Sequence, residues 1–163
     1  MKKIINSKSG ITLIELLLSI SLISSTLLIS TVFTNSLLEA RVKSQVIAEV
    51  DQQGIAAMEF IMEDIAQQSG ISSPAPGNRA SSLSYSGGSY SLSSGAIQKS
   101  GGGPPADLTN SQVVVTEIFF SNYALADTSD SIQIEFTVRY ANTDGRYEYT
   151  YEKTFYGTVN LKP

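Results

Sequence analysis

The feature that most constrains this chain is an apolar run, residues 11–33, in which Glu15 is the only ionisable residue. A run of about 23 residues is long enough to cross the roughly 30 Å hydrocarbon core of a bilayer as a helix. Lys2, Lys3 and Lys8 precede the run, whereas the charges that follow it nearly cancel. Because basic flanks stay in the cytoplasm, we expect a single membrane span with the C-terminal part of the chain exported.

Glu15 and Gly10 make this run unlike a secretory signal peptide. A signal peptide has an apolar core of about 7–15 residues and a small-residue cleavage site after it, but here Gly10 precedes the apolar run. An uncleaved signal anchor accounts for the length of the run and gives Glu15 no role. A carboxylate in a span costs about 2.5–3.5 kcal/mol at the bilayer centre and less near an edge, so it usually marks a functional pairing.

A basic leader, Gly10, and then Ile-Thr-Leu-Ile-Glu with the acid in fifth place together resemble the prepilin signature of type IV pilins and type II secretion pseudopilins. The resemblance covers roughly the first 40 residues closely, and the rest only in general plan. It implies that a membrane-embedded prepilin peptidase cuts between Gly10 and Ile11 and methylates the new terminus at Ile11. Ile11 replaces the commonest residue at this place, Phe, and this apolar substitution should leave processing intact.

The same resemblance implies an assembly role for Glu15, which would draw the subunit into a filament by pairing with the terminal amine of a neighbouring subunit. Two opposite charges that are each costly in an apolar bundle become tolerable when they are desolvated together.

Composition limits what the exported part can be. With 163 residues there is room for one small exported domain. The chain has no cysteine and no histidine, which excludes disulfides and metal sites built on these residues, and we expect no cofactor and no metal. The net charge is -4, and removing a leader with three lysines leaves 8 basic against 15 acidic residues, or -7. This acidic balance argues against non-specific nucleic-acid binding.

An amphipathic pattern continues the helix over residues 34–70. No proline interrupts residues 11–73, so we expect a helix that ends near Ser69, with Gly70 as its stop. Gly54 is the weak position and marks either a bend or a close contact. A break between Thr34 and Ser36, giving two helices, is the alternative. The apolar stripe recurs at spacings of three and four and comprises Leu38, Val42, Val46, Ile47, Val50, Gly54, Ala57, Met58, Ile61 and Ile65.

Residues 71–106 are rich in Ser, Gly and Pro, which predicts loops and turns. Within them, alternating apolar residues on both sides of Gly87-Gly88 favour a small hairpin of residues 82–86 and 89–93 over a Ser-rich linker.

Three further strands are predicted, over residues 112–121, 131–141 and 146–161. The last two form a hairpin around the turn at 142–145. Its apolar face should lie on the second half of the long helix. The expected fold class is therefore α+β, a long N-terminal helix packed on a small antiparallel sheet, which is the pilin-like plan. The expected divisions are a leader at 1–10, a membrane and filament-core helix at 11–33, its continuation at 34–70 and an exported β domain at 71–163.

The sequence offers few residues for chemistry. No spacing pairs two carboxylates in an apolar pocket, so we expect no enzyme. Calcium could bind around Asp127 and Asp130 with Thr128 and Ser129, although a solvated turn is the stronger interpretation. The run at Gly101 lacks the residues of a phosphate loop. A tyrosine-rich stretch could bind a partner, although cross-strand packing is favoured, and it comprises Tyr147, Tyr149, Tyr151 and Tyr156.

The predicted function is that of a structural subunit, with a weak preference for a minor one, of a type IV pilus or a type II secretion-like pseudopilus. Its expected partners are a prepilin peptidase, other subunits in a helical filament and the cytoplasmic (inner) membrane, with no nucleic acid. The subunit would leave that membrane for a cell-surface or periplasmic filament. The alternatives are an uncleaved, membrane-anchored binding domain that never polymerises, and a tip adhesin or DNA-uptake subunit.

Overall fold

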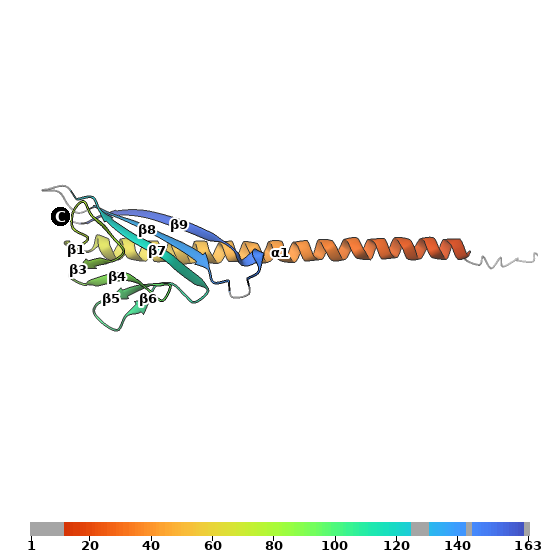
Figure 1. Cartoon of the computed structure of the whole chain (residues 1–163), viewed down its shortest axis with the longest axis horizontal. Coiled ribbons are helices and arrows are strands. Elements are labelled where there is room, and N and C mark those ends of the chain that lie inside the picture. Colours follow the sequence, from red (N-terminus) through yellow and green to blue (C-terminus); the bar gives the residue numbers. More distant parts are fainter. Residues whose placement is uncertain (1–11, 125–130, 143–144, 162–163) are drawn as a thin grey trace, which may run out of the picture. The chain divides into compact units, whose positions relative to one another are not determined.

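A long helix, α1 (Leu13–Ala66), begins the computed structural model, which describes residues 12–124, 131–142 and 145–161 (Figure 1). The chain divides inside α1 into one unit that ends at Arg41 and a second that begins at Val42. The helix predicted to reach Ser69 is confirmed but ends at Ala66. Residues 34–36, the alternative break, are helical.

In the first unit, the large apolar side chains of α1 are exposed, from Leu13 at 78 % to Leu38 at 55 %. Within the described residues, α1 is the one helix long and apolar enough to cross a membrane, and it lies near the N-terminus. The helix is therefore compatible with a single span. Its hydroxyls bond back to carbonyl oxygens one turn earlier, as expected for such a span, and they belong to Ser19, Ser25, Thr26, Ser30, Thr31 and Thr34.

The first sheet is built from the Ser- and Gly-rich part of the chain. It is antiparallel with the order β1-β3-β4-β5-β6, and its strands are β1 (Ile71–Ser73), β3 (Leu83–Tyr85), β4 (Gly88–Ser93), β5 (Ala96–Ser100) and β6 (Ala106–Asp107). The predicted hairpin is confirmed, with Leu83 opposite Tyr90. The prediction of loop for the rest of 71–106 is wrong where strands form, above all at β5, which pairs with β4 and buries Ile97 completely.

The second sheet has the order β2-β7-β8-β9 and is also antiparallel, with strands β2 (Arg79–Ala80), β7 (Val113–Asn122), β8 (Ser131–Tyr140) and β9 (Glu152–Asn160). The strands predicted at 112–121 and 131–141 are confirmed to within one residue. Strict alternation in β8 buries four side chains completely, those of Ile132, Ile134, Phe136 and Val138.

The prediction that the last strand begins at residue 146 is wrong. Residues 147–149 form a 3-10 turn, η1 (Tyr147–Tyr149), and β9 begins only at Glu152. The amide of Tyr149 donates to the carbonyl of Arg146, and that of Thr150 donates to Tyr147. These local bonds use backbone groups that a continuous strand would offer to β8.

The core of the second unit lies where α1 meets both sheets. Strands β7, β8 and β9 run alongside the C-terminal part of α1 (Figure 1), and a hydrogen bond of 2.7 Å from the Val115 amide to the Gly95 carbonyl links the sheets. Of the predicted stripe, Leu38 is exposed and Val42 and Ile47 are half-buried, whereas the other members are buried, namely Val46, Val50, Gly54, Ala57, Met58, Ile61 and Ile65. The α+β class is thus confirmed, with two antiparallel sheets in place of one.

Candidate functional site

Glu15, the residue assigned to assembly, lies exposed in the first turn of α1. Thr12 caps this helix end: its Oγ1 accepts a hydrogen bond from the Glu15 amide at 3.3 Å, and its carbonyl accepts one from the Leu16 amide at 3.1 Å. Thr12 and Glu15 have the spacing of a capping box, and a carboxylate is favourable near a helix N-terminus. The position of Glu15 in the first turn therefore also favours the helix end electrostatically, a local effect that was not predicted. Gly10 and Ile11 lie outside the described residues.

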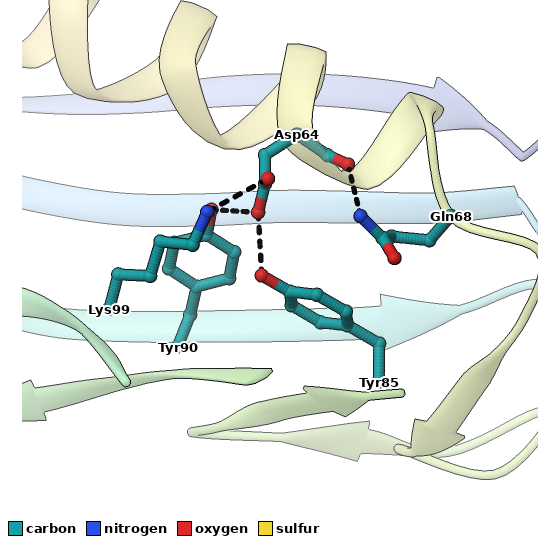
Figure 2. Close-up of polar contacts among 5 residues, drawn as sticks. All are labelled: Asp64, Gln68, Tyr85, Tyr90 and Lys99. Atoms are coloured by element: carbon teal, nitrogen blue, oxygen red, sulfur yellow. Dashed lines mark hydrogen bonds and ion pairs between the residues drawn. The ribbon is translucent and has the colours of Figure 1, made fainter. Parts of the chain in front are cut away.

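A second group of polar side chains joins α1 to the first sheet, and we call Asp64, Tyr85, Tyr90 and Lys99 the Asp64 cluster (Figure 2). Lys99 Nζ lies 2.8 Å from Asp64 Oδ1. The phenol hydroxyls of Tyr85 and Tyr90 both donate to Asp64 Oδ2, at 2.6 and 2.5 Å. The Asp64 carboxylate therefore receives three donors from three different strands.

Strand pairing places these donors on one side of the sheet. Tyr90 of β4 is directly opposite Lys99 of β5, and Tyr85 of β3 lies near them across the β3–β4 turn. The rings of Tyr85 and Tyr90 are 5.9 Å apart. The Lys99 ammonium also lies 5.3 Å from the centre of the Phe60 ring, which comes from α1. The helix and three strands thus converge on one carboxylate.

The electrostatics of the cluster favour one protonation state. Burial raises the pKa of Asp64, but the hydrogen bonds from Lys99, Tyr85 and Tyr90 outweigh it and the net pKa is lowered. Burial and the bond to Asp64 raise the pKa of both tyrosines. The hydrogen bond with Asp64 raises the pKa of Lys99. At neutral pH the cluster is therefore a carboxylate, an ammonium and two neutral phenols.

This arrangement is suited to holding α1 against the first sheet and not to catalysis. A carboxylate that already accepts three hydrogen bonds has little capacity left to act as a general base. The depression beside it, of about 230 Å³, is lined by Phe60, Glu63 and Asp64 of α1 and by Gln67, which follows the end of the helix. Its lining residues come from one short stretch of the chain, residues 60–67. The sequence holds one local signal for this site, because the acid Asp64 directly precedes Ile65, a member of the predicted apolar stripe.

The tyrosine-rich stretch does not form one face. Tyr149 stacks on Tyr140 with ring centres 5.8 Å apart, and Tyr151 packs against the core. Tyr147 and Tyr156 are exposed, at 81 % and 65 %. The packing interpretation therefore fits Tyr149 and Tyr151 only.

The predicted calcium position, Asp127 to Asp130, lies outside the described residues. In the described part of the chain, no group of three or more acidic side chains could hold a metal ion.

Comparison of the chain with protein-family models, with curated proteins and with solved structures found no match. The function is therefore inferred from the residues and their geometry.

Proposed function

We propose that this chain is a structural subunit of a type IV pilus or a type II secretion-like pseudopilus. In this proposal a prepilin peptidase cuts between Gly10 and Ile11, the mature subunit waits in the cytoplasmic membrane with its domain outside, and α1 then carries it into a filament. The proposal assigns no catalytic activity and no cofactor to the chain.

The observation that carries the proposal is the change of surroundings along α1. Leu16, Leu17 and Leu18 follow one another and are all exposed, although successive helical residues point about 100° apart. A helix that is apolar all round needs lipid or other helices around it. From Val46 onward the same helix buries one stripe in its own domain. A segment that moves from lipid into a bundle of like helices has apolar surroundings on all sides in both places, as the first half of α1 requires.

Glu15 supports the filament over a simple anchor. A carboxylate about one turn from the new N-terminus would remain near the membrane edge, where its cost is modest. In a filament core the amine of a neighbouring Ile11 would offset its charge. An anchor that never polymerises supplies no such partner.

The N-terminus of the mature protein tests the proposal. We would recover the chain from its own cells, in a membrane fraction and in a sheared-surface fraction, and determine its terminal residue by mass spectrometry. Methylated Ile11 in both fractions is the expected result. An intact leader, or a cut beyond Phe33, would refute the proposal and leave an anchored or secreted binding domain.

A further inference from the structure

Two small hollows border the stacked rings of Tyr140 and Tyr149, and the described residues that line them all belong to the second unit. One has a volume of about 220 Å³ and includes Arg139 and Asn142 in its lining, and we call it the Asn142 hollow. The other has a volume of about 180 Å³ and includes Glu49, and we call it the Glu49 hollow. Both are smaller than the roughly 300–1,000 Å³ of sites for drug-sized molecules, so they are suited to one small ring.

Backbone hydrogen bonds hold the two rings in place. The Tyr140 amide donates to the Tyr151 carbonyl at 3.1 Å, and the Ala141 amide donates to the Gln112 carbonyl at 2.8 Å. These bonds connect the end of β8 to the residue before β9 and to the residue before β7. Tyr149, on η1, then stacks on Tyr140 with ring centres 5.8 Å apart. The hollows are therefore formed by packed elements before any ligand is bound, as is usual for small-molecule sites.

The Asn142 hollow has a hydrogen-bond acceptor and a cation that are both unused. Asn142 Nδ2 donates to the Arg146 carbonyl at 2.9 Å, and since a carbonyl can only accept, this bond fixes which end of the amide is nitrogen. Among the described residues, buried Asn142 Oδ1 has no hydrogen-bond partner, which is unfavourable for an acceptor. In the same part of the chain, exposed Arg139 forms no ion pair. A ligand that donates to Asn142 and accepts from Arg139 would pair both groups.

The Glu49 hollow adds a fixed carboxylate and two side-chain amides. Glu49 Oε1 accepts hydrogen bonds from Asn110 Nδ2 at 2.9 Å and from Gln53 Nε2 at 3.2 Å, which hold the carboxylate in position. Gln45 and Gln112 also line this hollow, and both residues are exposed. A side-chain amide can donate as well as accept. The two hollows together therefore present both donors and acceptors around one pair of aromatic rings.

We propose that the Tyr140–Tyr149 pair binds a neutral hexose unit, with its ring against the tyrosines and its hydroxyls toward the two hollows. A sugar ring has an apolar face of C–H groups that packs on an aromatic ring, and its hydroxyls both donate and accept. A wholly apolar ligand would leave Asn142 Oδ1 without a donor. An anion would meet Glu49 and a cation would meet Arg139, so a ligand without charge is favoured. The site lies wholly in the second unit, so it adds sugar binding to the proposed structural role without resting on it.

Saturation-transfer NMR of the full chain can test this site. The protein would be kept in a detergent without a sugar headgroup, because such a headgroup would compete for the site. The probes are the methyl glycosides of glucose, galactose and mannose, with glucuronate and protonated glucosamine as charged counterparts. We expect at least one neutral glycoside to bind, with a dissociation constant in the millimolar range, and to bind more tightly than both charged sugars.

Tyr149→Leu is the test variant, because it removes the aromatic ring and keeps an apolar side chain. It should weaken binding at least about fivefold. Tyr156→Leu is the matched control, since Tyr156 is 65 % exposed and lies in β9, outside the lining of both hollows. Tyr149→Leu also removes the stack on Tyr140, so Gln112→Ala provides a second variant that keeps both rings. It removes one exposed amide and should weaken binding about threefold, while near-ultraviolet circular dichroism shows an unchanged fold.

Failure of all three neutral glycosides to bind would overturn the proposal. Equal losses in Tyr149→Leu and Tyr156→Leu would do the same, since the tyrosine pair would then not select the ligand. Tighter binding of a charged sugar, or unchanged affinity in Gln112→Ala, would also overturn it. Because the purified chain is used, none of these results bears on cleavage after Gly10 or on assembly through Glu15, which the N-terminus and the fractions from cells test separately.

Discussion

Gly54 of α1 lies directly against the ring of Phe155 in β9: a Cβ built on Gly54 would be 2.2 Å from Phe155 Cε2 and Cζ. The glycine that looks like a weak point in the helix is thus the place where a strand residue reaches the helix backbone. Phe155 in turn stacks on Phe136 of β8, with ring centres 5.6 Å apart. The contact fixes how closely α1 approaches the second sheet.

Gly54→Ala should therefore destabilise the domain, although alanine favours a helix by about 1 kcal/mol. Overpacking a core costs about 1–3 kcal/mol, and the clash is with a stacked ring that has little room to move. We expect a net loss of about 1 kcal/mol and a lower melting temperature. The measurement is near-ultraviolet circular dichroism of the full chain in detergent, which reports on its eight tyrosines.

Two glycines provide controls for Gly54→Ala. Gly70→Ala should have little effect because nothing lies within 4 Å of the added atom. Gly157→Ala meets the Sδ atoms of Met58 and Met62, which are ends of flexible side chains, so it should cost less than Gly54→Ala. Adding Phe155→Leu should recover part of the loss at Gly54. Equal effects at all three glycines would contradict the close-contact account.

The Asp64 cluster should make stability depend on pH in the acid range. Because the folded-state pKa of Asp64 is lowered, its carboxylate contributes stability above the unfolded-state pKa of about 4, and the contribution disappears as the pH falls through the folded-state value. Asp64→Asn should cost about 1–2 kcal/mol at pH 7, allowing for the partial exposure of the ion pair. The difference in melting temperature from the unchanged chain should shrink by about pH 3. Glu59→Gln, on the exposed face of α1, is the control. If the difference in melting temperature between Asp64→Asn and the unchanged chain stays constant with pH, the ion pair is not the cause of that difference.

Tyr90→Phe tests the buried phenol of the cluster. The ring of Tyr90 is fully buried, so the variant keeps its packing and removes one hydrogen bond to Asp64, at a cost of about 1 kcal/mol. It should also raise the pKa of Asp64, which a titration of the carboxyl carbon by NMR would detect. Tyr123→Phe removes the exposed bond to Gln133 and should change stability by less than about 0.5 kcal/mol. Similar losses of stability in both variants would indicate that the hydrogen bond to Asp64 contributes no more than an exposed one.

Glu15→Gln separates assembly from helix capping. If Glu15 pairs with a neighbouring terminal amine, the variant should enter the sheared-surface filament fraction about tenfold less than the unchanged chain while its domain melts normally. Thr12→Ala removes the hydroxyl that accepts the hydrogen bond from the Glu15 amide but keeps the Glu15 carboxylate. This variant should therefore still assemble. Equal losses in both variants would assign Glu15 a local helix-capping role. Quantitative immunoblots of the two fractions provide the measurement.

The elements that sequence patterns predicted best were those with a single strong period. The alternation of Ile132 to Val138 predicted both β8 and its buried face, and the stripe from Val46 to Ile65 predicted the packed side of α1. Patterns failed where a single apolar residue stands among polar ones, as at Ile97 in β5, because one isolated position has too little period to distinguish a strand from a loop. They also failed at Tyr147, where alternation continued but local backbone bonds formed η1.

Residue order alone was enough to predict the apolar segment with Glu15 inside it, the long helix and the antiparallel character of the domain. Each of these follows from composition and spacing over neighbouring residues, which set local backbone preference and the faces that must leave water. The folded arrangement was needed to find that Gly54 receives Phe155, and that Asp64 collects Tyr85, Tyr90 and Lys99. These contacts join residues 21 to 101 positions apart, and they depend on strand register and on the approach of helix to sheet. No local pattern contains that information, because it arises only when the elements pack together.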